Sequence, residues 1–101
     1  MMDNDKKDNA EEAGTMPEAS FGLFISGLMM EGLIALGEME HPVTKKKEPD
    51  LKHATFVIDT LAMLKEKTRN NLTGEEDGAL EAVLYDLRMR FVAKADKGKA
   101  P

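Results

Sequence analysis

The chain contains no cysteine and no tryptophan, and its only aromatic residues are four phenylalanines and one tyrosine among 101 residues. Without cysteine it can form no disulfide, no zinc–thiolate site and no thiol nucleophile. So few aromatic side chains offer little surface on which the bases of a single-stranded nucleic acid could stack. The net charge of −5 also disfavours nucleic-acid binding, because that binding depends on the neutralisation of phosphates.

The most unusual stretch is an apolar run over residues 21–37. Its sequence is FGLFISGLMMEGLIALG, and Glu31 is its one charged residue. A helix formed from this run has no polar face, so it must be covered on more than one side. In so small a protein we expect a second copy, another partner or lipid to provide part of that cover.

Apolar spacing predicts an all-α protein with three helices, at residues 17–36, 50–69 and 73–93. The second helix carries an apolar stripe from Leu51 to Leu64, and the third carries one from Leu80 to Phe91. The short link between these two helices predicts an antiparallel helix 2–helix 3 hairpin. We expect the apolar helix 1 to pack on this hairpin.

Residues that favour helix ends support these boundaries. Asp50 is suited to begin the second helix, and Gly37 and Asn70 are residues that tolerate the left-handed turn at a helix end. Thr73 and Glu76 have the spacing of a capping box, in which each side chain bonds the backbone N–H of the other.

The two ends of the chain are polar and charged. Residues 1–17 are predominantly acidic and residues 94–101 predominantly basic, and neither has the apolar residues that a folded segment needs. We therefore expect a disordered tail at each end of a single domain over residues 18–93. The first residues do not resemble a secretory signal, and the absence of cysteine fits a reducing interior.

No residue pattern indicates catalysis. The loop acids and histidines (Glu38, Glu40, His41, and further on Asp50 and His53) include metal-binding groups, but they lack a pair spaced four apart on a helix. Neither serine of the chain has a histidine near it in sequence to act as a base. We therefore predict that the protein is not an enzyme and that it binds no cofactor and no metal. We expect the basic run at residues 45–47 to be part of a solvated loop.

Two structural sites follow from the predicted helices. The hairpin register places Asp59 and Arg88 about a turn apart, so we expect an ion pair that fixes the register. The hairpin can cover only part of the first helix, and the uncovered part would form an interaction surface. The residues that we expect on this surface are Phe21, Phe24, Leu28, Met29, Leu33 and Ile34.

Three short motifs resemble those of a family of small bacterial proteins, the domain of unknown function 1844 family. They are LGE at residues 36–38, KTRNNLT at residues 67–73, and LR-x-x-F at residues 87–91. Family members usually have glycine where this chain has Asn70, and both residues suit a left-handed turn. The resemblance implies a small helical, cytoplasmic bacterial protein, and it implies no activity, cofactor or site residue.

These observations together predict a self-associating or partner-binding module without catalytic activity. A homodimer is the first expectation, because twofold symmetry is the commonest form of self-association. The alternative is a membrane-associated protein that uses the apolar residues 19–36. Their length is at the short end for spanning a bilayer, and Glu31 would lie near its centre.

Overall fold

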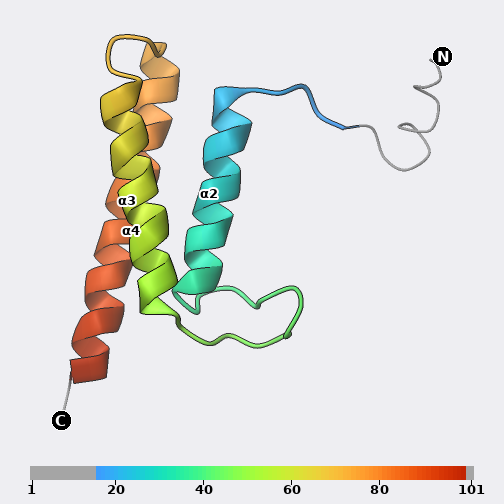
Figure 1. The fold of residues 1–101 in the computed structure, drawn as a ribbon, viewed down its shortest axis with the longest axis vertical. Helices are drawn as coiled ribbons and strands as arrows, with labels where there is room; N and C mark the ends of the chain where they lie inside the picture. Colours follow the sequence, from blue (N-terminus) through green and yellow to red (C-terminus); the bar gives the residue numbers. More distant parts are fainter. Residues whose placement is uncertain (1–15, 100–101) are drawn as a thin grey trace.

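The computed structural model describes residues 16–99, and within this range it has three helices and no strand. They are α2 (Phe21–Ala35), α3 (Leu51–Lys67) and α4 (Gly74–Lys99), and each contacts the other two. α3 runs antiparallel to both α2 and α4 (Figure 1). The predicted all-α, three-helix fold is therefore confirmed. The tail expected at the N-terminus lies mostly outside the described residues.

The sequence predicted that α2 begins at Pro17, but the helix begins at Phe21. The reason is Ser20, whose backbone is extended and whose Oγ accepts a hydrogen bond from the Leu23 N–H at 3.1 Å. A serine at this position satisfies one of the free N–H groups of the first turn, so it fixes the start of the helix. At the other end Gly37 has a φ of +78°, which confirms it as the residue that stops the helix.

The α3–α4 hairpin has the predicted capping residues. The Asp50 carboxylate accepts a hydrogen bond from the His53 N–H at 3.2 Å, and Asn70 has a φ of +64°. The capping box is complete: the Glu76 N–H donates to Thr73 Oγ1, and the Thr73 N–H donates to Glu76 Oε1, both at 3.0 Å. These bonds end one helix and begin the next within a few residues, which forces the two helices to run antiparallel.

α4 is longer than predicted, because it continues past residue 93 to Lys99. The expected basic tail is therefore helical over residues 94–99. The Lys94 ammonium lies 3.3 Å from the Glu38 carboxylate, just beyond the end of α2. This contact holds the extra turn to the body of the protein, and the alanines on either side of Lys94 favour helix.

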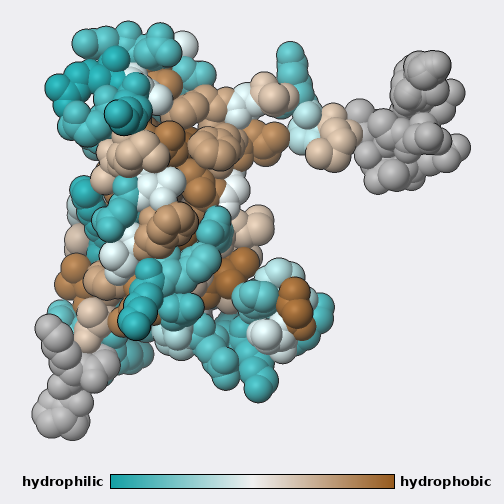
Figure 2. Space-filling model, in the orientation of Figure 1, coloured by the Kyte–Doolittle hydropathy of each residue, from teal (hydrophilic) through white to brown (hydrophobic). Residues whose placement is uncertain are grey.

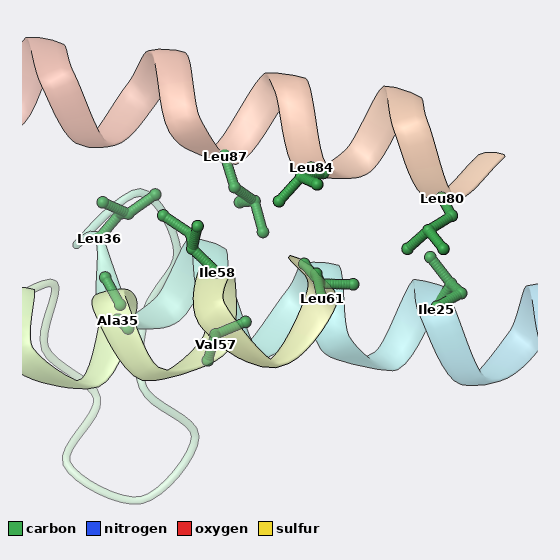
Figure 3. Packing of buried hydrophobic residues seen from close by; sticks show 10 residues of the cluster. Ile25, Ala35, Leu36, Val57, Ile58, Leu61, Leu80, Leu84 and Leu87 are labelled. Atoms are coloured by element: carbon green, nitrogen blue, oxygen red, sulfur yellow. The ribbon is translucent and has the colours of Figure 1, made fainter. Parts of the chain in front are cut away.

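The hydrophobic core lies where the three helices meet. Its side chains point inward from all three helices (Figure 3). The buried residues are Ile25, Ala35, Leu36, Ala54, Val57, Ile58, Leu61, Leu80, Leu84 and Leu87. The apolar stripes predicted for the hairpin are thus the stripes that are buried.

Candidate functional site

The predicted interaction surface on α2 divides between two sides of the helix. Phe21, Leu28 and Leu33 are half-buried and pack against the core, so they hold the protein together. Phe24 is exposed, with 53% of its surface accessible, and Met29 and Ile34 are half-buried. The sequence could not make this division, because a helix that is apolar all round does not indicate which side faces its own hairpin.

Four residues mark the side of α2 that points away from the core. They are Leu23, Gly27, Met30 and Ile34, which are spaced by four, three and four positions and therefore follow one line along the helix. Leu23 is 47% exposed and Met30 is 52% exposed, and a Cβ added to Gly27 would meet no atom within 4 Å. This line is the apolar surface that the hairpin does not cover.

α3 extends the same surface. The His53 Nε2 lies 2.8 Å from the Glu31 carboxylate, so this edge of α3 adjoins α2. The His53 ring contacts the edge of Phe56 at a centroid distance of 6.3 Å, and Phe56 is 65% exposed. Met63, two turns further along α3, is also exposed.

We call this surface the outer face. It comprises Leu23, Phe24, Gly27, Met30 and Ile34 of α2 with Phe56 and Met63 of α3. In Figure 2 apolar residues gather over the region that α2 and α3 occupy in Figure 1. The prediction missed Leu23, Gly27, Met30, Phe56 and Met63. Phe56 directly precedes Val57 of the buried stripe in the sequence, so it lies about 100° around α3 from that residue. An aromatic residue outside the apolar stripe of a helix is the signal that could have found it.

A groove of about 890 Å³ lies at the C-terminal end of the outer face. Its walls are one side of α2, the loop over residues 38–50 and the first turn of α3. The α2 wall is mainly apolar, whereas the loop contributes charged and polar groups. The lining residues are Gly27, Met30, Glu31, Ile34, Ala35, His41, Pro42, Thr44, Lys46, Glu48, Pro49, Asp50, Leu51, Lys52 and His53.

The loop histidine has a structural role. His41 Nδ1 accepts hydrogen bonds from the Val43 N–H at 3.0 Å and the Thr44 N–H at 3.3 Å, which closes the turn that carries the basic run. His53 instead pairs with Glu31 on α2. In residues 16–99 no three histidines or acidic residues are grouped so that they could hold a metal ion.

The predicted ion pair between Asp59 and Arg88 is not formed, and both side chains are exposed. The ion pair that joins α3 to α4 is Lys65–Glu81, whose hydrogen bond raises the pKa of Lys65. At 3.6 residues per turn, Asp59 lies roughly 120° around α3 from Lys65. The Lys65–Glu81 contact agrees with the predicted antiparallel hairpin. Asp59, however, is on the side of α3 that faces away from α4.

Other ion pairs connect α4 to the turn after α2. Arg90 lies 2.8 Å from Asp86 and 3.8 Å from Glu38. The hydrogen bond with Asp86 is the main reason that the pKa of Arg90 is raised. Arg90 and Lys94 of α4 thus both contact Glu38, and together they join α4 to the turn that follows α2.

α4 carries a second exposed apolar stripe. Tyr85, Met89 and Val92 are exposed along the side of α4 that faces away from the core. Arg88 and Arg90 flank Met89 in the sequence, and the stripe contributes no residue to the groove between α2 and α3. It therefore differs from the outer face in charge and in shape.

Across residues 16–99, none of the helices has both the length and the apolar character that crossing a membrane requires.

Comparison with known proteins identifies a family for this chain but no individual relative. No curated protein and no solved structure matches the chain. The model of the family described as Domain of unknown function (DUF1844) matches residues 18–93, which include the whole of α2 and α3 and most of α4. The resemblance carried by the LGE, KTRNNLT and LR-x-x-F motifs is thus confirmed, and the chain belongs to the DUF1844 family.

Proposed function

We propose that this protein is an interaction module that works by binding and not by catalysis, and that its first partner is a second copy of itself. The observation that carries the proposal is the exposure of Leu23, Phe24 and Met30 on the outer face of α2. Burying a fully exposed side chain of this kind stabilises by about 1.5–3 kcal/mol before the entropy of association is counted. Because these three side chains are about half exposed, each can contribute about half of that. Contiguous apolar surface rimmed by polar residues is typical of protein–protein contacts.

The groove supports the same proposal. Its apolar wall continues the outer face through Met30 and Ile34, so an apolar side chain of a partner can enter it without losing contact with α2. Glu31 and His53 line the groove and contact each other at 2.8 Å, so the Glu31 carboxylate already has a hydrogen-bonding partner within the chain. Such an apolar depression with a polar rim resembles the core and rim of a protein interface.

Sedimentation equilibrium tests self-association. We expect a mass of about twice the chain mass of 11.2 kDa for the unchanged protein. Met30→Asp should shift the mass toward that of one chain, because a carboxylate would be buried in an apolar interface. Leu28 and Leu33 are unsuitable positions for this test, since both pack against the core.

Met89→Asp is the matched control. Met89 and Met30 are both 52% exposed in helices, but Met89 lies on the α4 stripe. We expect Met89→Asp to leave the mass unchanged and both variants to keep the helical circular dichroism of the parent. A protein that sediments as one chain at every concentration, or a mass that responds to Met89→Asp and not to Met30→Asp, would contradict the proposal.

A further inference from the structure

The spacing of the outer face is self-complementary when one α2 helix is laid antiparallel on another. If Leu23 of one copy faces Ile34 of the second, then Met30 of each copy faces Gly27 of the other. Gly27 has open space where a Cβ would be, and methionine is the side chain that best fills an irregular gap. We propose that two copies pair through antiparallel α2 helices in this register, a geometry that rests on the self-association proposed above.

The groove has a defined occupant in this arrangement. Leu23 of the second copy is set against Ile34, and Ile34 is part of the groove wall. Leu23 and Phe24 of each copy thereby enter the groove of the other. Each copy inserts side chains into the groove of the other, so both grooves are filled. Such a contact is closed by its twofold symmetry, and no groove is left for a third copy.

The same symmetry places α3 against α3. The twofold axis passes between the two α2 helices at the level midway between Leu28 and Met29, because that level is equally far from Leu23 and Ile34. The contact between Glu31 and His53 aligns the antiparallel α2 and α3, which puts the same level of α3 between Thr55 and Phe56. Residues equally far from this level on α3 therefore face each other across the axis.

Lys52 and Asp59 are such a pair. Each lies three and a half positions from the axis, and at about 100° per residue both lie on the same side of α3 as the exposed Phe56 and Met63. Both side chains are exposed, and neither forms an ion pair with another described residue. In the dimer Lys52 of each copy meets Asp59 of the other, which gives Asp59 a cation that Arg88 does not supply.

These two cross-pairs matter because each chain carries a net charge of −5. Two such chains repel each other unless opposite charges meet at the contact. α2 adds no repulsion, since its one acid, Glu31, lies beside the outer face and already contacts His53. The outer face is therefore electrostatically matched to a second copy of itself.

The exposed apolar side chains of the outer face supply more than half of the area that a stable dimer needs. A phenylalanine buries about 150–250 Å² when fully enclosed, so five large side chains that are each about half exposed offer roughly 500 Å² per copy. The groove walls and the Lys52–Asp59 pairs add to this sum. A standard protein interface takes about 800 Å² from each partner.

Exchanging the charges tests the register by sedimentation equilibrium. Lys52→Asp and Asp59→Lys, each alone, place like charges at both cross-pairs, and we expect each to raise the dimer dissociation constant at least about tenfold. An equimolar mixture of the two variants should recover the dimer mass, because every cross-pair then joins opposite charges. The doubly exchanged variant should also be dimeric.

Arg88→Asp is the control, since it changes an exposed charge on α4 and should leave the dimer intact. Circular dichroism should show that every variant keeps its helices. A dimeric parent whose single exchanges have no effect, or whose mixture stays at the mass of one chain, would overturn this register and leave self-association standing. A parent that is a single chain at every concentration would overturn both proposals.

Discussion

Gly32 occupies the one place on α2 where the helix has no room for a side chain. A Cβ at this position would lie 2.8 Å from Leu87 Cδ1 and 3.4 Å from Val57 Cγ1, so the backbone of α2 rests directly on side chains of both other helices. Gly27, five residues earlier, has no such neighbour. Two glycines in one helix therefore have opposite roles: Gly32 lets the core close, and Gly27 leaves a gap on the outside.

We expect Gly32→Ala to lower the free energy of unfolding by about 0.5–2 kcal/mol. The added methyl group forces the fully buried Leu87 to move, and this cost outweighs the gain in helix propensity. Gly78→Ala is the control, since the space around Gly78 in α4 is open. It should raise the free energy of unfolding by roughly 0.5–1 kcal/mol through helix propensity alone. Urea denaturation measures both, and a stabilising Gly32→Ala would show that α2 does not approach the hairpin this closely.

At the scale of the element, the helix ends show what the sequence could predict. Asp50, Asn70 and the pair Thr73 and Glu76 act through contacts within a few residues, so their roles were readable from spacing alone. The extension of α4 past residue 93 was not readable in this way, because Lys94 at its start contacts Glu38, which is far away in the sequence. Local signals set most helix ends, and contacts between elements set the rest.

The capping box gives the prediction at this scale. Thr73→Ala should lower the free energy of unfolding by about 0.5–2 kcal/mol, since the Glu76 N–H loses its acceptor at the start of α4. Thr73→Ser keeps a hydroxyl oxygen at that position and should cost much less. Thermal or urea unfolding compares the two, and equal losses would mean that the hydroxyl does not cap the helix in solution.

At the scale of the whole molecule, three helices bury one side of α2 and leave the other side apolar. The sequence predicted that the hairpin would be too narrow to cover α2, and Leu23, Phe24 and Met30 are indeed exposed. It could not predict which residues those would be, because the choice depends on how α2 turns toward α3 and α4. It also could not place Phe56 beside them, since that needs the contact between Glu31 and His53.

The central claim is that a second copy covers the outer face of α2. Nuclear Overhauser effects between an isotope-labelled and an unlabelled chain, measured in a mixed sample, test it most directly. We expect cross-peaks from the Met30 methyl group of the labelled chain to the α protons of Gly27 in the unlabelled chain. If the Met30 methyl group shows contacts to its own chain alone, at concentrations well above micromolar, the claim is contradicted.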